Sequence, residues 1–197
     1  NEGTGNIAHD SIGNNNGEIH GASWVKGIND NALSFDGKND YIRVSNNNLN
    51  PSNELTVIAW VKWDIEPSTG QHWANIISKN GDNEWQIQHS YGNDKFEFAV
   101  KTENARKYVW STTKPVKGKW YQVAGVYDGK YIKIYVNGRL ENKVPLTGKI
   151  KTSSSEIDIG RRTWRDRYFN GVIDEVSIYD KALTDEEIRE LYNNLGG

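Results

Sequence analysis

Apolar and polar residues alternate along most of this chain in short runs. The runs are rich in Val, Ile, Tyr, Phe and Trp, and clusters of Gly, Asn, Asp and Ser separate them. Alternation with a period of two, interrupted by turn residues, is typical of an antiparallel β sandwich or barrel. The pattern predicts strands over Ala32–Phe35, Tyr41–Val44, Leu55–Trp63, Asn75–Lys79, Glu84–His89, Lys95–Val100, Tyr108–Thr112, Trp120–Tyr127, Tyr131–Val136, Glu156–Gly160 and Gly171–Tyr179.

The predicted strands are joined by sequences that favour tight turns. Asp128-Gly129 and Asn137-Gly138 supply residues that accept positive φ, which two-residue hairpin loops require. Gly92-Asn93-Asp94 indicates a slightly longer turn. No change in composition marks a linker, so we expect a single domain over residues 1–197.

The segment from Phe169 to Ile188 joins the last predicted strand to a helix. Thr184, with Glu187 three residues later, forms a capping box that starts the helix. Leu191 follows Ile188 at helical spacing, so we expect this face to dock on the sandwich. Helical periodicity is almost absent before Thr184. The sequence therefore predicts a β domain that closes with one short helix.

The same alternation places polar side chains on the outside of the middle strands. If Ile87 and Phe98 point into the core, their neighbours along each strand point away from it. The side chains that we expect to face outward in this way, on a candidate ligand-binding sheet, are Gln86, Gln88, Glu97, Lys101, Lys133 and Tyr135. Amide and aromatic groups along one face suit neutral sugars, although they are also common on any solvated sheet.

Charge and composition exclude several classes of partner. The formal net charge is −2 and no basic run stands out, so we expect no nucleic acid and no anionic membrane as partner. The chain has no Cys, which removes disulfides and thiolate metal sites. It also has no Met, even at position 1, and its first residues do not resemble a signal peptide. We expect a module of a larger secreted protein.

A series of short motifs, in order along nearly the whole chain, resembles the laminin-G-like, concanavalin-type jelly rolls. The motifs are Asp10-Ser11, Gly13-Asn14, Gly17, Gly21-Ala22, Trp24, Ala32-Leu33, Phe35-Asp36-Gly37, Asp40-Tyr41, Ile58 to Lys62, Ile77 to Lys79, Lys119-Trp120, Val123-Ala124, Val126 to Gly129, Tyr135 to Gly138, Ile159 to Arg161 and the Phe169–Ile188 segment. The resemblance implies an all-β, two-sheet antiparallel jelly-roll sandwich with a concave face. That fold hosts lectins, carbohydrate-binding modules, glycosidases and adhesion domains.

The resemblance also implies a structural calcium ion on the convex side. Related jelly rolls hold it with an acidic residue of the final strand and groups from the N-terminal part. This carries over to Asp174, to Asp36 or Asp40, and less securely to Asp10. The alternative is that Asp36 and Asp40 cap a turn and Asp174 accepts backbone hydrogen bonds. The four histidines have no pair at metal-ligand spacing, so we expect no zinc.

One strand resembles the catalytic strand of jelly-roll glycosidases without completing it. Glu156 and Asp158 share a face, as a nucleophile and an assisting acid do in those enzymes. The position of the acid/base is occupied by Gly160 or Arg161. No thiol nucleophile, nucleophile elbow or phosphate loop occurs elsewhere. We therefore expect no enzyme activity.

Aromatic residues are the strongest sign of a ligand. The chain has eight Trp and ten Tyr, and aromatic rings stack well on the apolar faces of sugars. We expect four tryptophans, Trp24, Trp60, Trp85 and Trp120, to be used in packing. Trp73, Trp110 and Trp164 remain as candidate sugar contacts, with Trp63 as a weaker one. Trp164 lies in an Arg-rich segment, 161–167, that leaves an acidic sugar possible.

These observations favour a non-catalytic carbohydrate-binding module that targets an appended glycan-active enzyme or cell-surface protein to a polysaccharide or oligosaccharide. The expected glycan-binding residues are Trp73, Gln86, Gln88, Trp110, Arg161 and Trp164. We expect a monomer, covalently linked to neighbouring domains, outside the cell or at its surface. The alternative is a protein-interaction or adhesion module in which the same aromatic residues dock another domain.

Overall fold

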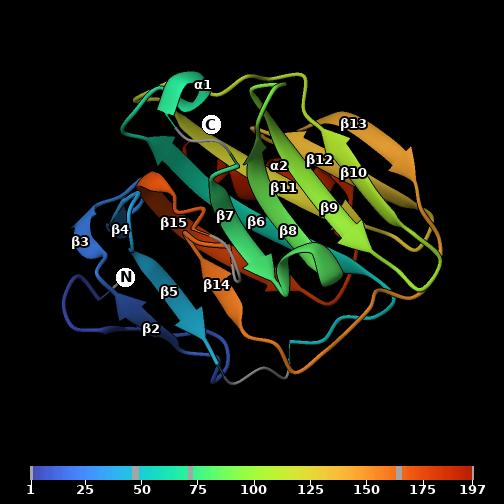
Figure 1. Ribbon diagram of the computed structural model, residues 1–197, viewed down its shortest axis with the longest axis horizontal. Helices are drawn as coiled ribbons and strands as arrows, with labels where there is room; N and C mark the ends of the chain where they lie inside the picture. The colour runs from blue at the N-terminus through green and yellow to red at the C-terminus, as the bar shows by residue number, and fades with distance from the viewer. Residues whose placement is uncertain (1, 46–48, 71–72, 163–165, 197) are drawn as a thin grey trace.

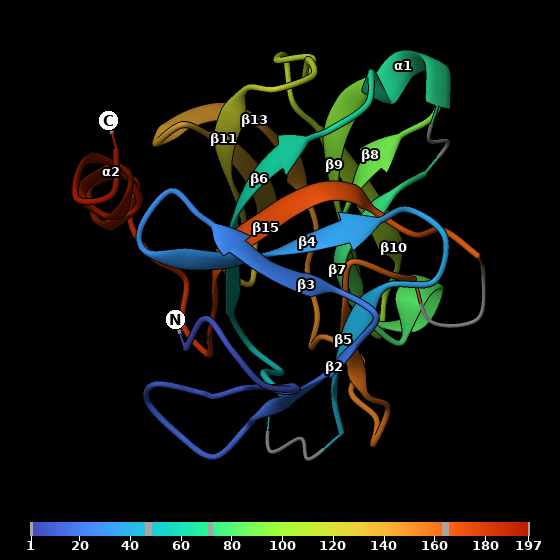
Figure 2. The same cartoon turned by 90° about the vertical axis from the view of Figure 1, so that its left-hand side faces the viewer.

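Two antiparallel sheets pack face to face in the computed structural model, which describes residues 2–45, 49–70, 73–162 and 166–196 (Figures 1 and 2). The eight-stranded sheet has the order β1 (Ile7–Ala8), β2 (Gly17–His20), β5 (Tyr41–Val44), β14 (Ile157–Ile159), β7 (Asn75–Lys79), β8 (Trp85–Ser90), β9 (Lys95–Lys101) and β10 (Arg106–Trp110). The seven-stranded sheet has the order β13 (Arg139–Pro145), β12 (Tyr131–Val136), β11 (Trp120–Tyr127), β6 (Leu55–Trp63), β15 (Asn170–Tyr179), β4 (Asn31–Asp36) and β3 (Ser23–Lys26). The predicted all-β jelly-roll sandwich is confirmed.

Every strand that the alternation predicts is present, with ends that differ by two residues or fewer. The pattern missed β1, β2, β3 and β13. Three of these lie at the edges of the sheets, and the fourth, β2, is next to an edge. Most side chains of β13 are exposed, because an edge strand has few neighbours to cover it. Its sequence therefore lacks the apolar alternation that identifies the central strands.

The core lies between the two sheets and explains why Trp63 is not a surface residue. Alternate residues of β6, beginning with Leu55, point inward, and this register places Trp63 in the core with no exposed surface. Its ring lies 4.9 Å from that of Phe169 and 5.5 Å from that of Phe96, centroid to centroid. The weaker prediction that Trp63 contacts a sugar is wrong.

The four tryptophans expected to pack do so to different degrees. Trp85 is in the core between the sheets, and Trp60 is buried on the opposite face of β6. Trp24 and Trp120 are only half-buried, so the expectation of burial is too strong for them. Trp120 pairs with Lys62 across the ladder, and the Lys62 ammonium lies 5.2 Å from its ring centroid.

Helix α2 (Asp185–Asn193) covers part of the outer face of the seven-stranded sheet (Figure 2). The predicted capping box is present: the Thr184 hydroxyl accepts from the Glu187 N–H, and the Glu187 carboxylate accepts from the Thr184 N–H. The helix stacks Tyr192 on Trp60 with centroids 5.5 Å apart. The hydroxyl of Tyr135 donates a hydrogen bond to Asp185, the first residue of the helix, at 2.7 Å.

The prediction that Tyr135 and Lys133 lie on the candidate ligand-binding sheet is therefore wrong. Both point away from the core as predicted, but β12 belongs to the seven-stranded sheet, whereas Gln86, Gln88 and Glu97 lie on the other one. Tyr135 is buried beneath the helix, and burial beside Asp185 raises the pKa of its phenol.

Two short helical turns, α1 (Pro67–Gly70) and a 3-10 turn (Gly81–Asn83), complete the described elements. No helix in the described ranges has the length and apolar character needed to cross a membrane.

Candidate functional site

A row of polar side chains crosses four neighbouring strands on the outer face of the eight-stranded sheet. Asn75 of β7 pairs with Gln88 of β8, Gln88 pairs with Glu97 of β9, and Glu97 pairs with Trp110 of β10. Because paired residues in antiparallel strands point to the same face, all four side chains lie side by side. Figure 1 shows these four strands as one curved layer.

The hydrogen bonds in this row all donate toward Glu97. The Asn75 amide donates to the Gln88 side-chain carbonyl at 3.4 Å, and the Gln88 amide donates to Glu97 Oε1 at 2.7 Å. From the other side, Trp110 Nε1 donates to Glu97 Oε2 at 2.7 Å. The Ser90 hydroxyl is a further hydrogen-bonding partner of the carboxylate. Four strands are thereby linked through one acid.

The row is buried although it lies outside the core. Asn75 has no exposed surface, and Gln88 and Glu97 are each 1% exposed. Burial raises the pKa of the Glu97 carboxyl, although the hydrogen bonds from Gln88 and Trp110 act in the opposite direction. Gln86, which pairs with Ser78 in the next row, is fully buried as well. Gln86 and Gln88 face outward as predicted, but their burial suits support of the surface better than direct contact with a ligand.

The surface at this end of the sheet is aromatic. Trp110 stacks on Tyr108, with ring centroids 6.1 Å apart and ring planes 13° apart. Trp73 lies against Tyr91, with centroids 6.5 Å apart, and Tyr91 is 53% exposed. The indole N–H of Trp110 also donates to the hydroxyl of Ser90, the residue before Tyr91, at 3.2 Å. The two aromatic pairs are therefore neighbours.

Arginines border both pairs. The Arg167 guanidinium lies 5.3 Å from the ring centroid of Trp73, and the Arg106 guanidinium lies 4.9 Å from that of Tyr108. Trp73 adopts a left-handed backbone conformation, with φ of 64°, which is unusual for a bulky residue. Trp73 and Trp110 are thus both partly exposed at this end of the sheet, and their contact with a glycan stays a prediction. Trp164, which was expected there too, lies outside the described residues.

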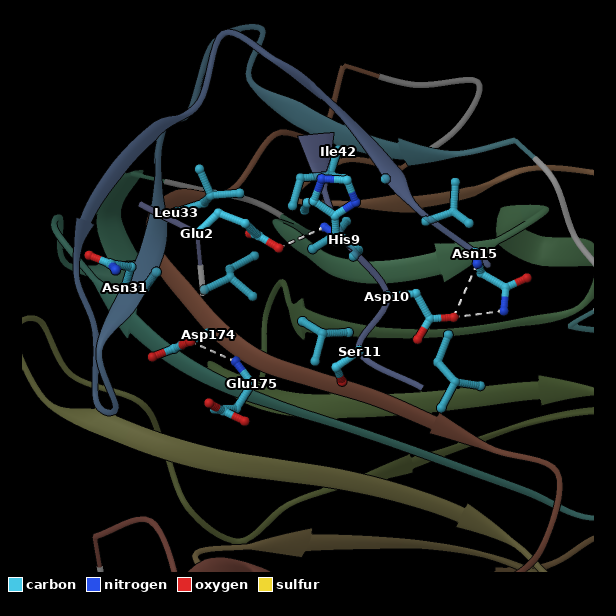
Figure 3. Close-up of a pocket in the computed structure, with 18 of the residues that line it drawn as sticks. Glu2, His9, Asp10, Ser11, Asn15, Asn31, Leu33, Ile42, Asp174 and Glu175 are labelled. Carbon is cyan, nitrogen blue, oxygen red and sulfur yellow. Dashed lines mark hydrogen bonds between the residues drawn. The ribbon is translucent and has the colours of Figure 1, made fainter. Parts of the chain in front are cut away.

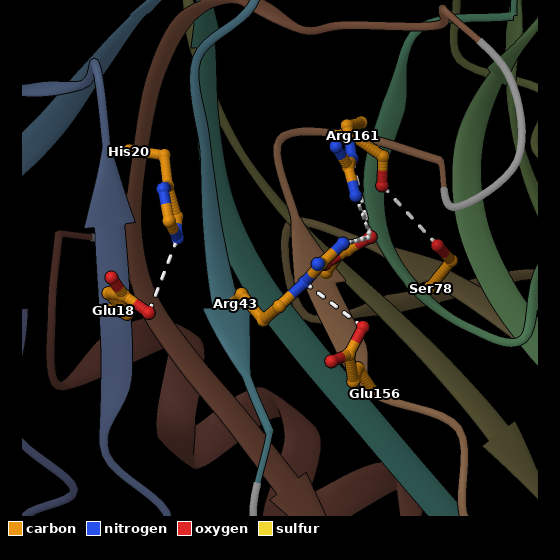
Figure 4. A network of polar contacts seen from close by, with 7 residues as sticks. Glu18, His20, Arg43, Ser78, Glu156 and Arg161 are labelled. Carbon is orange, nitrogen blue, oxygen red and sulfur yellow. Dashed lines mark hydrogen bonds and ion pairs between the residues drawn. The ribbon is translucent and has the colours of Figure 1, made fainter.

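Arg161 belongs to a second network on the same face. Asp158 of β14 is fully buried and accepts from Arg43 at 3.0 Å and from Arg161 at 3.0 Å. Arg43 also pairs with Glu156 at 3.1 Å (Figure 4). The Arg161 guanidinium lies 3.9 Å from the ring centroid of Tyr41.

The two networks meet through the strand register. Asp158 pairs with Ser78, and Ser78 pairs with Gln86, so the ion pairs of β5 and β14 continue the polar face of β7 and β8. The hydroxyl of Ser78 donates to the carbonyl of Arg161 at 3.3 Å, as Figure 4 shows. Charge is balanced here, with two arginines against Glu156 and Asp158. Both carboxylates are thus engaged by guanidinium groups.

The predicted metal ligands are distributed over more than one place. Asp10 and Asp174 line a cavity of about 330 Å³ that also receives Glu2 and Glu175 and has apolar walls (Figure 3). Asp174 of β15 pairs with Trp60 of β6 and precedes a bulge at Glu175, whose φ is 47°. Figure 3 shows the carboxylates of Asp10 and Asp174 apart from each other, each facing its own N–H donor.

Backbone N–H groups already occupy these oxygens. Asp174 accepts from Ile28 at 2.9 Å and from Glu175 at 2.8 Å, and burial raises the pKa of its carboxyl. Asp10 accepts from the N–H groups of Ile12 and Asn15, which hold its pKa down to about 2. Each N–H group uses one of the lone pairs of its carboxylate and holds the carboxylate in an orientation set by the local backbone.

Asp36 and Asp40 close a turn, as the alternative interpretation predicted. The Asp36 N–H donates to Asp40 Oδ2 at 2.8 Å, and Asp36 accepts from the Lys38 N–H at 2.8 Å. No three His, Cys, Asp or Glu side chains gather into a metal-binding group anywhere in residues 2–45, 49–70, 73–162 and 166–196. As they stand, the four acids do not fit a shared calcium ion, so calcium stays a prediction from the family resemblance.

Comparison with known proteins identifies the family. A profile for Laminin_G_3, described as the concanavalin A-like lectin/glucanases superfamily, matches residues 36–189. The chain belongs to the concanavalin A-like lectin/glucanase superfamily. A comparison with curated protein sequences returned no match.

Solved structures with a similar fold include domains of larger proteins. Domain 4 of AbnA, an extracellular arabinanase from Geobacillus stearothermophilus solved with arabinotriose, is 24% identical, with a TM-score of 0.70 over 94% of this chain and 86% of that one. The binding domain of Paraclostridial Mosquitocidal Protein 1 is 16% identical, with a TM-score of 0.76 over 95% and 51%. The botulinum neurotoxin serotype D ligand-binding domain, solved with N-acetylneuraminic acid, is 19% identical, with a TM-score of 0.72 over 95% and 50%. This superfamily chain thus spans about half of the two toxin domains.

Sequence alternation identified which residues face outward but missed several members of the site. Asn75, Tyr91 and Tyr108 were not among the expected contacts, and Asp158 was weighed only as part of a catalytic strand. Strand pairing places Asn75 beside the predicted Gln88, whereas Tyr108 lies two residues before the predicted Trp110 on the same face of one strand. Tyr91 follows β8 in a turn, where alternation carries no information. Strand pairing would have found Asn75, and alternation along the predicted strand Tyr108–Thr112 would have found Tyr108.

Proposed function

We propose that this chain is a non-catalytic carbohydrate-binding module that holds its glycan on the aromatic end of the eight-stranded sheet. The observation that carries this proposal is the pair of neighbouring, partly exposed aromatic platforms, Trp73 with Tyr91 and Tyr108 with Trp110. Aromatic faces that are fixed in place bind the apolar faces of sugar rings at little entropic cost. The arabinotriose and N-acetylneuraminic acid named with two solved structures support a sugar as ligand.

Each part of the surface has its own role in the proposal. The rings of Trp73 and Trp110 stack on the glycan, and exposed polar groups at their borders bind its hydroxyls. Gln86 and Gln88 support the platform from below. Arg161 lies further along the face, where its guanidinium borders Tyr41. Trp164, outside the described residues, is kept as a proposed contact from the sequence.

The charge balance of the face favours a neutral glycan. Arg43 and Arg161 are both paired with Asp158, and Arg106 lies 2.8 Å from the carboxylate of Asp82. A guanidinium that is already neutralised by a carboxylate adds little attraction for a uronic or sialic acid. Neutral polysaccharides are therefore proposed ahead of the acidic sugars that the Arg-rich segment left open.

In the proposal the module is a monomer within a multidomain extracellular protein. Binding of a module to a polysaccharide raises the effective concentration of whatever is linked to it, with no bond chemistry of its own. An extracellular arabinanase with a similar domain supports this arrangement.

Affinity electrophoresis tests the proposal. The chain is run through native gels that contain one neutral polysaccharide each, chosen to cover arabinans, xylans, mannans and β-glucans, with pectate and alginate as acidic comparisons. We expect retardation by at least one neutral polymer. Retardation by none, together with capture of a linked domain of the parent protein, would replace the proposal with the protein-interaction alternative.

Calcium is tested separately by thermal unfolding. A tightly held ion stabilises the folded state by about 3 kcal/mol at one hundred times its Kd, which corresponds to a Tm increase of about 5–10 °C for a chain of this size. Because backbone N–H groups already satisfy Asp10 and Asp174, we expect a difference of less than about 2 °C between excess chelator and millimolar calcium. A larger increase with calcium, absent from Asp174→Asn, would establish the ion that the resemblance predicts.

A further inference from the structure

Glu97 is the acid on which the hydrogen bonds of the candidate site converge. Its two carboxylate oxygens accept from Gln88 Nε2 and from Trp110 Nε1, each at 2.7 Å. We propose that Glu97 is a positioning residue, whose ionised carboxylate holds the Trp110 ring in its glycan-binding orientation and makes binding depend on pH. This inference rests on the proposed function, because it assigns Trp110 to the binding surface.

The direction of the hydrogen bonds explains why the ionised form of Glu97 holds Trp110 more strongly. An indole N–H only donates, and Gln88 also presents an N–H to the acid. A proton on Glu97 would face one of these two donors or the Ser90 hydroxyl, which can accept it, and Trp110 would then donate to a neutral carboxyl instead of a carboxylate. Gln88 cannot turn its amide to accept this proton without losing the bond from Asn75 to its carbonyl. Protonation therefore weakens the contact that orients Trp110, because a hydrogen bond to a neutral carboxyl is weaker than one to a carboxylate.

The groups around Glu97 shift the pH at which its carboxylate takes up a proton. Gln88 and Ser90 face it from β8, and Trp110 and Arg106 face it from β10. Of these groups only Arg106 is charged, and it lowers the pKa of Glu97. Burial is the larger effect and raises that pKa above the ordinary value of about 4.3. Trp110 is therefore held strongly at neutral pH and more weakly as the pH falls through the raised pKa.

Stability and binding should respond to this proton in opposite directions. A carboxyl whose pKa is higher in the folded than in the unfolded chain binds more protons when folded. Between the ordinary pKa and the raised one, acidification thus favours the folded state through Glu97, while it weakens the acceptor of Trp110. A residue with only a structural role would weaken both together. The difference between wild type and Glu97→Gln isolates this contribution from those of Asp40 and Asp174, whose pKa values are also raised.

An NMR titration without any glycan tests the contact itself. The chain has eight Trp, so a ¹⁵N-labelled sample gives up to eight indole N–H signals. The signal missing from Trp110→Phe belongs to Trp110. We expect it to shift upfield as the pH falls from 7 toward about 4.5, because a charge-assisted hydrogen bond becomes a weaker, neutral one, and to remain unshifted in Glu97→Gln. A Trp110 signal that does not titrate in wild type, or titrates equally in Glu97→Gln, overturns the proposal.

Glycan affinity over the same pH range tests the consequence. We expect wild type to lose about fivefold or more of its affinity for the retarding polysaccharide on acidification, and Glu97→Gln to bind about fivefold more weakly at pH 7 with a flat profile. Glu103→Gln, an exposed acid in the turn after β9, should keep the wild-type profile. Trp110→Phe keeps the ring but not the donor and should also give a flat profile, which covers the case of a Glu97→Gln variant that does not fold.

The two measurements distinguish failure of the positioning role of Glu97 from failure of the proposed carbohydrate-binding function. A titrating Trp110 signal with pH-independent glycan affinity would overturn the positioning role while leaving the carbohydrate-binding function in place. If no glycan binds at any pH, the proposed function fails, and the NMR titration decides the Glu97–Trp110 contact by itself.

Discussion

Trp110→Ala and Trp73→Ala should each weaken binding of the retarding polysaccharide by about 2 kcal/mol, or roughly thirtyfold, as measured by isothermal titration calorimetry. Each substitution removes one platform, Trp110 from its stack on Tyr108 and Trp73 from its contact with Tyr91. Large rings held in place at the centre of a binding surface contribute most of the affinity in many complexes. The double variant should show no measurable binding.

Trp120→Ala is the matched control for these variants. Trp120 is also half-buried and also lies near a cation, Lys62, but it belongs to the seven-stranded sheet. We expect it to bind the polysaccharide with wild-type affinity. If Trp120→Ala lost binding while Trp73→Ala and Trp110→Ala kept it, the binding surface would have to be moved to the other sheet.

Gly171→Ala should destabilise the folded chain by at least about 3 kcal/mol and lower the Tm by about 6–12 °C in a thermal unfolding experiment. Gly171 has φ of 146°, a conformation that residues with a side chain rarely adopt. An added Cβ would overlap the carbonyl oxygen of Lys62 and lie 2.9 Å from the Cα of Trp63. Both obstacles are backbone atoms of β6, the central neighbour of β15, so they cannot move aside.

Gly92→Ala separates the two causes of this loss. Gly92 also has a positive φ, 92°, but no atom lies within 4 Å of the position of an added Cβ. It should therefore show only the cost of the backbone conformation, about 1 kcal/mol, with a Tm decrease of about 2–4 °C. An equal decrease in Tm for both variants would mean that the overlap with β6 adds little to the destabilisation by Gly171→Ala.

The relation between the fold and the candidate site lies in the pairing of the strands. The outward positions of β7, β8, β9 and β10 are aligned by antiparallel register, so residues far apart in the sequence form one continuous row. Glu97 lies between two strands that each present a donor to it. A surface of this kind can be changed at its exposed rings while the buried row that orients them stays the same.

The amino-acid sequence determined the central strands, the terminal helix and the outward direction of Gln86, Gln88 and Glu97, because these depend on a local period of two and on a capping box at Thr184. It could not determine that Gln86 and Gln88 are buried, or that Tyr135 lies under a helix, because burial depends on which distant segment covers a side chain.

Only the tertiary structure brought Trp73 against Tyr91 and Trp110 against Tyr108, and only it paired Asp158 with two arginines. It also placed Asp36 and Asp40 in a turn of their own, and Asp10 and Asp174 in the wall of a cavity. The physical reason is the same in each case. Alternation fixes the face on which a side chain lies, whereas strand order and register fix its neighbours, and those neighbours decide whether a ring is a platform or an acid is a ligand.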